Sequence, residues 1–559
     1  MALERSRDNE ALDADAERSR DARWCLVLWL VFTLVATGLY GSALTAPFVS
    51  DDIGYLVSHP YTESVDGETI REMFDPWGPA KLYTANYAPV HLLLTAIERE
   101  MFAEDLLGYH LVNVVLHALA GALLVVWLWQ AGIGRLAAIG AGVVFLVHPA
   151  NVEAVAWCSQ LKTVAALVFS LGALVTLRRL PAVATLLFML GLLTKASAML
   201  TLPVAAVWAF TSGGAQARRT GFWLVGWLVL TGLYAVPQYT SFAHLGAVDV
   251  PAFDEPWVQA RTIAAIGARY LVMALTSYGV SAWHEPLPVT SWGDPWLIGG
   301  LLAALLMGGR FVWTLFARSP EAMFWVAVAA AFAPVSQLFP FATPMADRYL
   351  YFMLPGLLGG ILLAARALAA RLEIDPPRMA PVMAACAFSL AFVFGCHSAN
   401  RMPMWQHETR LLLDAAIHYP EGATASFMRA RRAAQDGDLE RALEELRVAA
   451  DRGIDRFMAL PQDPGLAPLR DEPAFRELVK ELAGRWIARA RSRGYSTQPE
   501  LRVLGIAHLQ REEYVEAVAA FERSLHAGGP LDATVRVELE EARVRLALNQ
   551  GRATEHGTR

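Results

Sequence analysis

The sequence predicts an all-α protein, in which a polytopic membrane domain with about eleven spanning helices precedes a small α-helical repeat domain. Three observations predict this fold. Hydrophobic residues make up 55% of the 559 residues and charged residues only 18%, a composition too apolar for most soluble proteins. The long apolar runs are confined to residues 24–400. Residues 401–559 are charged, rich in alanine and soluble in character.

The N-terminal segment 1–23 is polar and contains five arginines, so we expect a disordered cytoplasmic tail. The apolar run at 24–46 follows it. This run is longer than the apolar region of a typical signal peptide, and no clean cleavage site comes after it. We therefore interpret 24–46 as the first spanning helix rather than as a cleaved signal peptide.

The remaining apolar runs are long enough, or nearly long enough, to span a membrane. They lie at 108–131, 134–148, 160–178, 181–195, 198–213, 220–237, 295–316, 321–340, 348–368 and 379–397. The positive-inside rule places the arginine clusters between them, such as Arg178–Arg179 and Arg218–Arg219, in the cytoplasm. All of these clusters can lie on the cytoplasmic side only if the segment 263–280 does not cross the membrane. We expect it to lie in the membrane interface or to re-enter.

The same orientation places the acidic and basic motifs discussed below, the loop 238–294 and the whole C-terminal domain outside the cytoplasm. We therefore expect a multi-pass membrane protein with residues 401–559 on the extracytoplasmic side. The net charge of −6 gives no indication of nucleic-acid binding. The four cysteines show no spacing typical of a disulfide framework or a metal site.

Two segments of the C-terminal domain, 423–453 and 501–525, match the pattern of small and aromatic residues in tetratricopeptide repeats. In the second segment these positions are Gly505, Ala517 and Phe521. A proline-containing insert separates the two segments, so we predict a short and irregular repeat domain that binds a protein partner. A generic helical bundle is the alternative.

The stretch FVSDDIGYLVSHP places two adjacent carboxylates, Asp51 and Asp52, where the chain leaves the first apolar run. One explanation is a helix cap. The other is functional, because two acids at a membrane edge repel each other, which raises one pKa or binds a cation. A base at this position could accept the proton of an acceptor hydroxyl. A divalent cation held by Asp51 and Asp52 is a possible cofactor; no other is indicated.

Three cations also lie at the predicted outer membrane edge: Lys162, Lys195 and Arg348. A single lysine at such an edge usually extends its ammonium group to water. Three converging cations would instead suit a lipid-linked phosphate. Polar residues beside them are candidates for supporting roles, namely His148 and Glu153 in the loop before Lys162, and Asp347 and Tyr351 around Arg348.

In GYHLVNVVLHALAG, the residues His110, Asn113 and His117 fall on one face of a helix. Polar residues inside a spanning helix usually pair with neighbouring helices, so we expect interhelical hydrogen bonds. Zinc binding is the alternative, although two histidines two turns apart are poorly spaced for one ion.

Six motifs occur in one order: FVSDDIGYLVSHP, NYAPVHLLL, GYHLVNVVLHAL, HPANVEAVAWCSQLKTVAAL, GLLTKASAMLTLP and MADRYLYF. This order, with tetratricopeptide-like segments behind it, resembles the transmembrane and tetratricopeptide repeat-containing O-mannosyltransferases and their bacterial relatives. These are protein O-mannosyltransferase-like enzymes of the GT-C class of glycosyltransferases. The resemblance covers residues 24–455. The chain departs from the family at Tyr87-Ala88-Pro89-Val90, where relatives usually read Y-R-P-L.

The resemblance implies a hexosyltransferase that takes a mannose-like sugar from a polyprenyl-phosphate donor and transfers it to a protein or glycan acceptor. The enzyme would lie in a bacterial inner membrane, with residues 401–559 in the periplasm. As the catalytic pair, Asp51 would be the base or the carboxylate that positions the acceptor, and Asp52 would help to orient the acceptor or the donor. Arg348, Lys195 and Lys162 would stabilise the leaving phosphate. His148, Glu153, Asp347, Tyr351, Tyr87 and His110 would support them. Two other hypotheses remain open: a non-catalytic membrane scaffold with protein-binding repeats, and a polysaccharide ligase or polymerase.

Overall fold

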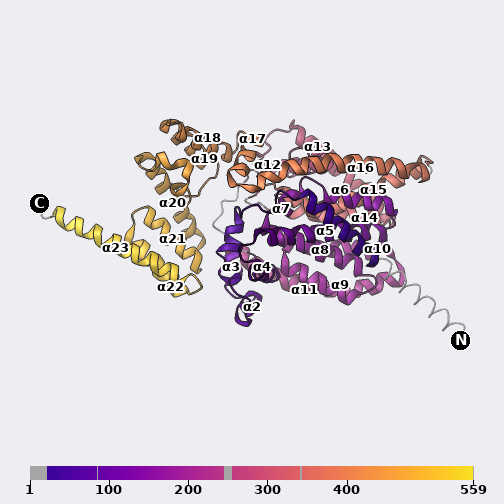
Figure 1. The fold of residues 1–559 in the computed structure, drawn as a ribbon, viewed down its shortest axis with the longest axis horizontal. Coiled ribbons are helices and arrows are strands. Elements are labelled where there is room, and N and C mark those ends of the chain that lie inside the picture. Colours follow the sequence, from indigo (N-terminus) through magenta and orange to yellow (C-terminus); the bar gives the residue numbers. More distant parts are fainter. Residues whose placement is uncertain are drawn as a thin grey trace.

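The computed structural model describes residues 22–557 except 85, 245–252, 254, 340–342 and 375. The predicted tail therefore lies almost entirely outside the described residues. The fold is all-α, as predicted, and the described residues contain no β-structure beyond one bridge between His284 and Met345. Figure 1 shows the long helices packed side by side along the longest axis of the molecule, with the C-terminal helices at one end.

Seven described helices are long and apolar enough to cross a membrane. They include the first described helix, Ala22–Leu39, and α5 (Leu106–Gln130), α8 (Leu161–Thr176), α11 (Gly214–His244), α13 (Pro295–Phe316), α15 (Asp347–Arg371) and α16 (Pro376–Arg401). Four shorter apolar helices are α6 (Arg135–Leu146), α9 (Pro181–Thr194), α10 (Thr201–Ser212) and α14 (Glu321–Phe332). Together they coincide with the apolar runs read from the sequence, which makes the chain an all-α polytopic membrane protein.

Shorter helical elements lie at one end of this bundle. They are η1 (Ile53–Val57), η2 (Pro60–Thr62), α2 (Gly67–Phe74), α3 (Ala80–Thr84), α4 (Pro89–Phe102), α7 (Asn151–Ala156), η3 (Cys158–Gln160), η4 (Ala196–Leu200) and η5 (Ala333–Val335). Figure 1 shows α2, α3, α4 and α7 on the side of the bundle that faces the C-terminal helices. The loops between spanning helices thus carry ordered structure at this end.

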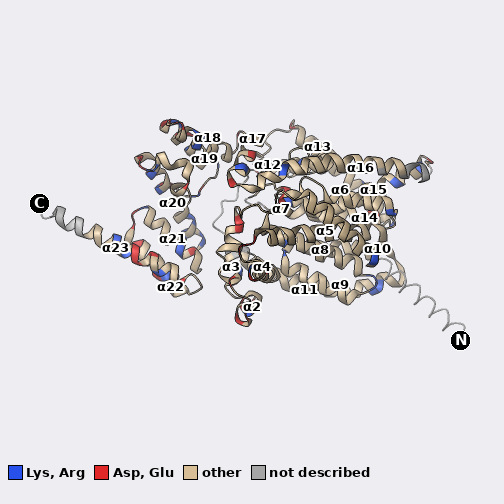
Figure 2. Cartoon of the chain, viewed as in Figure 1, with Lys and Arg blue, Asp and Glu red and all other residues tan. Residues whose placement is uncertain are grey.

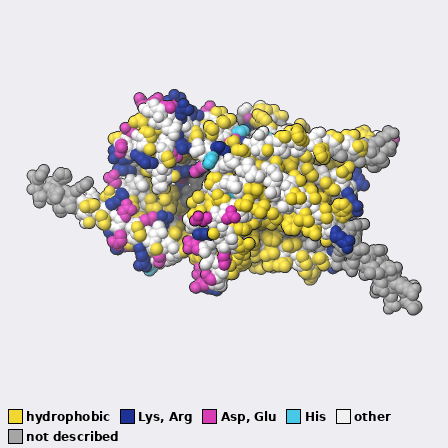
Figure 3. Space-filling view, viewed as in Figure 1, with side chains coloured by type: hydrophobic (Ala, Val, Ile, Leu, Met, Phe, Trp, Pro, Cys, Tyr) yellow, Lys and Arg dark blue, Asp and Glu magenta, His cyan; other side chains and the backbone are white. Residues whose placement is uncertain are grey.

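The surface of the bundle agrees with a membrane environment. Large apolar side chains are exposed on its outer helices, among them Phe222 and Leu233 on α11, Leu305 on α13 and Phe388 on α16. Figure 3 shows this apolar surface as a continuous yellow area. In Figure 2, basic side chains gather at the end of the bundle away from the C-terminal helices, the distribution on which the predicted orientation depends.

Glycines allow close packing of the spanning helices, as is common in membranes. A Cβ atom on Gly359 of α15 would come within 2.2 Å of the Phe324 ring on α14. On α13, a Cβ atom on Gly300 would come within 1.9 Å of the backbone oxygen of Ala264. These helices therefore approach each other more closely than any residue with a side chain would permit.

The segment 263–280, predicted not to cross, belongs mostly to one helix, α12 (Pro256–Thr276). Arg261 and Arg269 on this helix lie 4.8 Å from the ring centre of Trp292 and 4.6 Å from that of Trp296. Figure 1 draws α12 at the end of the bundle nearest the C-terminal helices. Tryptophan and arginine together are typical of the membrane interface, so the interfacial position stays our prediction.

The C-terminal helices are α17 (Glu408–His418), α18 (Ala423–Gln435), α19 (Leu439–Asp451), α20 (Pro473–Arg493), α21 (Gln498–Gln510), α22 (Tyr514–Ala527) and α23 (Asp532–Gly557), after the short η6 (Met402–Gln406). Two short 3₁₀ helices, η7 (Leu460–Gln462) and η8 (Pro464–Leu469), occupy the proline-containing insert. Residues between Ala430 and Ala520 form a hydrophobic core separate from that of the bundle. Gly505 lies against the ring of Phe521, where a Cβ atom would come within 2.6 Å, which is the small-against-aromatic contact that the repeat pattern predicts.

Candidate functional site

The three predicted cations each stand at the beginning of a helical element. Lys162 is the second residue of α8, Lys195 immediately precedes η4, and Arg348 is the second residue of α15. The structure brings them together: the charges of Lys162 and Arg348 both act on Lys195. Because a helix N-terminus carries partial positive charge, this arrangement concentrates positive potential at one end of the bundle.

The arginine differs from the lysines, because its charge is already compensated. The backbone N–H of Arg348 donates to Oε2 of Glu153 at 2.7 Å, and its Nη1 donates to Oε1 of the same carboxylate. Glu153 is only 1% exposed. A buried carboxylate that is paired at both oxygens holds its partner firmly, so Glu153 fixes the position of Arg348 and neutralises it.

The two lysines have hydroxyl groups as partners rather than a carboxylate. Nζ of Lys162 donates to the hydroxyl of Tyr55 at 3.1 Å and lies 4.3 Å from the centre of its ring. Nζ of Lys195 donates to Oγ1 of Thr163 at 2.6 Å. Within the described part of the chain, neither lysine forms an ion pair. An added anion would therefore find two uncompensated ammonium groups here.

Burial, followed by repulsion from Lys162 and Arg348, holds the pKa of Lys195 well below its usual range. Such a shift is typical of functional sites, although structural networks also produce it. An anion bound between these groups would restore the proton of Lys195. The mutual repulsion of these cations therefore favours the binding of an anion between them.

The two acids have different surroundings. Asp52 is 1% exposed, and its carboxylate accepts hydrogen bonds from the backbone N–H groups of Val49 at 3.0 Å and Ser159 at 2.7 Å. Burial outweighs these bonds and raises the pKa of Asp52 to about 7. Asp51 is exposed, and its charge reaches Arg348. Asp52 thus fixes the loop to η3, whereas Asp51 is free to meet a substrate.

A divalent cation between Asp51 and Asp52 fits these contacts poorly. Both oxygens of Asp52 already accept backbone N–H groups. No group of three or more His, Cys, Asp or Glu side chains that could hold a metal ion occurs among the described residues. The described residues therefore offer a cation at this point no more than the two carboxylates of the acid pair.

Three of the supporting candidates are occupied by contacts that hold the bundle together. Nε2 of His148 binds the backbone oxygen of Ala274 at 3.0 Å. The hydroxyl of Tyr87 donates to the backbone oxygen of Phe74 at 2.8 Å. The hydroxyl of Tyr351 lies 2.8 Å from Nδ1 of His117.

The polar face of α5 makes the interhelical contacts expected from the sequence. Nε2 of His110 binds the backbone oxygen of Ala46 at 3.0 Å. The amide of Asn113 reaches the backbone oxygen of Trp157 at 3.2 Å, and Nε2 of His117 that of Leu146 at 3.0 Å. Each of these side chains bonds to a segment other than its own helix, which confirms hydrogen bonding as their use here.

One residue of the cluster was missed by sequence reasoning. His91 on α4 is 1% exposed, its ring centre lies 5.3 Å from that of Tyr55, and its Nδ1 has no partner among the described residues. Burial, then the charges of Lys162, His59 and Lys195, holds its pKa well below the usual range. The motif NYAPVHLLL contains His91, but only the packing of α4 beside α8 and α9 shows that it faces the lysines.

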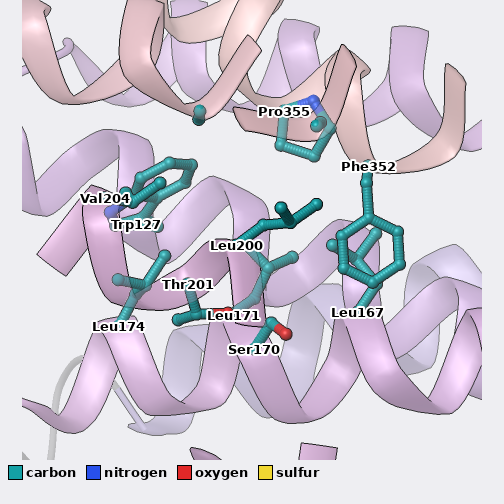
Figure 4. Close-up of a pocket in the computed structure, with 12 residues that line it drawn as sticks. Trp127, Leu167, Ser170, Leu171, Leu174, Leu200, Thr201, Val204, Phe352 and Pro355 are labelled. Atoms are coloured by element: carbon teal, nitrogen blue, oxygen red, sulfur yellow. The ribbon is translucent and has the colours of Figure 1, made fainter. Parts of the chain in front are cut away.

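A small apolar pocket lies inside the bundle (Figure 4). It is lined by residues from α5, α8, η4, α10, α14 and α15, including Trp127, Leu167, Leu200 and Phe352. Leu167, Leu200 and Phe352 follow Lys162, Lys195 and Arg348 by four or five residues in their respective elements. At about 1.5 Å per helical residue, the pocket begins roughly one to two turns deeper in the bundle than the cations.

Two curated proteins are similar to parts of the chain. A protein O-mannosyl-transferase of Caenorhabditis elegans is 29% identical over 180 residues, which cover 30% of this chain and 25% of that protein. A protein O-mannosyl-transferase of Drosophila melanogaster is 25% identical over 291 residues, or 46% of this chain and 33% of that protein. The matched region thus spans a quarter to a third of the length of these relatives.

No protein-family profile matches the chain, and no solved structure matches it. The relationship therefore rests on the two matches, together with the ordered motifs and the helical membrane fold in which they lie. On this evidence, the chain is a distant relative of the protein O-mannosyl-transferases.

Proposed function

We propose that the chain is an integral membrane glycosyltransferase of the GT-C class. It moves a mannose-like hexose from a polyprenyl-phosphate donor to the hydroxyl of a protein or glycan acceptor. The reaction takes place on the periplasmic face of a bacterial inner membrane, where the C-terminal helices also lie and bind a protein partner. The observation that carries the proposal is the cluster of Lys162, Lys195 and Arg348, each of which precedes a residue that lines an apolar pocket by four or five positions.

The donor phosphate binds at the two lysines, because their charges are uncompensated and Arg348 is already paired. The beginnings of α8 and η4 add backbone N–H groups and a favourable dipole. The polyprenyl tail then runs along the apolar helices near the pocket of Figure 4, which has an almost entirely apolar lining and, at about 40 Å³, is too small to enclose the tail. One ligand with a charged head and an apolar tail satisfies both parts of the site.

Asp51 is the base of the reaction. The acceptor hydroxyl attacks the anomeric carbon of the hexose, its proton passes to Asp51, and the bond from that carbon to the phosphate oxygen breaks. This displacement inverts the anomeric centre. Arg348, fixed by Glu153, and the two lysines stabilise the charge that develops on the departing phosphate. Asp52 holds the loop that presents Asp51.

The printed names of the two relatives support transfer of mannose to protein. The fold supports a lipid donor, because the cations lie where spanning helices begin. A non-catalytic scaffold would need neither exposed Asp51 nor lysines without ion pairs.

The test follows labelled hexose lost from polyprenyl phosphate in liposomes that contain purified protein. The variants are Asp51→Asn and, as a control, Glu63→Gln, an exposed acid of the same loop. We expect release by wild type and Glu63→Gln, and a loss of at least about 100-fold in Asp51→Asn, because a general base contributes about 10²–10⁴. Equal release by Asp51→Asn would remove Asp51 from the chemistry. No release by folded wild type with any hexose would favour the scaffold.

A further inference from the structure

A chain of hydrogen bonds through His284 connects the C-terminal helices to the candidate site. The hydroxyl of Tyr419, which follows α17, lies 2.8 Å from Nδ1 of His284. Nε2 of the same ring lies 2.7 Å from Oδ1 of Asp347. Asp347 is the first residue of α15 and directly precedes Arg348. A side chain from the soluble part thus reaches within one residue of a candidate phosphate-stabilising cation.

The direction of these bonds follows from the groups involved. An ionised carboxylate can only accept, so Nε2 of His284 carries a proton and donates it to Asp347. In the neutral ring, Nδ1 is then the acceptor, and the Tyr419 hydroxyl is its donor. The His284 and Asp347 side chains are 0% and 3% exposed. Water therefore cannot easily replace either bond, and the loss of one would leave a buried polar group unpaired.

The loop that contains His284 is bound to the C-terminal helices at two further points. The Asp414 carboxylate on α17 accepts from the backbone N–H of Ala282 at 2.8 Å. Glu285 accepts from the backbone N–H of Thr424 at 3.2 Å and from its hydroxyl at 2.7 Å. The contact through His284 continues to α15, and a second one does so through Ser281, whose hydroxyl donates to Asp414 at 3.2 Å and whose backbone N–H donates to Oδ1 of Asp347 at 3.3 Å. The bonds between Glu285 and Thr424 end on the C-terminal helices. Docking of the C-terminal helices and the link to Arg348 are therefore separable by mutation.

We propose that Tyr419 and His284 are positioning residues of the reaction: through Asp347 they fix the first turn of α15, and with it Arg348. This inference rests on the proposed function. The backbone N–H of Arg348 binds Glu153, so a small shift of this turn would move Arg348 and Glu153 together relative to the lysines. A misplacement of about 1 Å near reacting groups costs up to about 100-fold in rate.

The test compares Tyr419→Phe with Glu285→Ala in the transfer assay. Tyr419→Phe removes one hydroxyl, and Glu285→Ala removes a docking contact that does not continue to α15. We expect Tyr419→Phe to lower kcat about tenfold with the KM for donor within about twofold, because outer-shell partners of an active group are worth about 10–100-fold. Glu285→Ala should keep kcat within about twofold. Unchanged kcat in Tyr419→Phe, or an equal loss in both variants, would overturn the inference.

A double-mutant cycle shows whether Tyr419 acts through Arg348. The kcat losses of Tyr419→Phe and Arg348→Lys should combine less than additively, whereas those of Glu285→Ala and Arg348→Lys should add. The same double-mutant cycle can be measured on the midpoint temperature of thermal unfolding, which requires no donor. If wild-type protein released no sugar, the proposed function would fail, and the thermal cycle would then show only whether Tyr419 is coupled to Arg348. Additive effects of Tyr419→Phe and Arg348→Lys in the thermal cycle would overturn the inference.

Discussion

The cations at the outer end of the bundle differ in how each charge is balanced. Arg348 is paired with a buried carboxylate, while the partners of Lys162 and Lys195 among the described residues are hydroxyl groups and an aromatic ring. A paired buried cation contributes to stability and position, whereas an unpaired one favours an anionic ligand. This difference yields two predictions.

Lys195 should take up a proton when the donor binds. Its pKa is depressed in the free protein by burial and by Lys162 and Arg348, and an adjacent phosphate raises it again. Between the pKa of Lys195 in the free protein and its pKa in the complex, donor binding takes up a proton. Donor affinity should therefore fall as the pH rises through this range. Calorimetry in two buffers of different ionisation heat measures the uptake. Lys195→Arg, whose guanidinium stays charged, should show none; equal uptake by both proteins, or none by wild type, would contradict the assignment.

Arg348→Gln should mainly lower folding stability, whereas Lys162→Gln should mainly weaken donor binding. Arg348→Gln leaves Glu153 buried without its cation, which costs about 3–5 kcal/mol of folding free energy. Lys162→Gln removes a charge that no carboxylate pairs, so the thermal midpoint should change little and donor affinity should weaken about tenfold or more. Thermal unfolding and donor titration of both variants provide the measurement. A destabilised Lys162→Gln protein with normal affinity would be evidence against a phosphate site.

At the scale of residues, the sequence predicted where the charged residues of the candidate site lie, but not which residues they contact. Lys162, Lys195 and Arg348 were recognisable because each follows or begins an apolar run. That Glu153 would pair with Arg348, 195 residues away, depends on how α7 packs against α15. The burial of Asp52 likewise depends on the N–H of Ser159, in a loop that no local pattern links to the first one.

At the scale of elements, the close approach of α12 to α13 depends on one glycine. Gly300→Ala should place a Cβ atom against the Ala264 backbone, which cannot move without displacing its helix. Overpacking of this kind costs about 1–3 kcal/mol. Gly299→Ala is the matched control, because its Cβ atom would lie at an ordinary 3.7 Å from Cβ of Ala268. Thermal unfolding in detergent should show a lower midpoint for Gly300→Ala alone; equal midpoints would mean that the helices are farther apart.

The helices themselves were largely predictable from hydrophobicity, since each apolar run became a helix. The elements that form the site were harder. α4 is mildly apolar and too short to span, and no charge pattern shows that it carries His91 to the lysines. α12 was recognised only as a segment that the parity of arginines excluded from crossing. Such helices are defined by tertiary contacts rather than by their own periodicity.

For the whole molecule, the account combines two parts in one site: cations at the beginnings of three helical elements, and an apolar pocket deeper in the bundle (Figure 4). The sequence could place the cations at one membrane face, because the arginine distribution fixes the predicted orientation. It could not show the pocket, whose lining comes from helices distant in the chain. The two parts together are the reason for proposing a lipid-linked donor rather than a soluble one.

The measurement that tests this claim most directly compares two donors that carry the same labelled hexose, one on polyprenyl phosphate and one on a nucleoside diphosphate. Both are offered to purified wild-type protein in liposomes, and transfer of label to an acceptor or to water is followed. The account predicts that label leaves the polyprenyl phosphate and stays on the nucleotide. Transfer from the nucleotide donor, or from neither donor by folded protein, would contradict it.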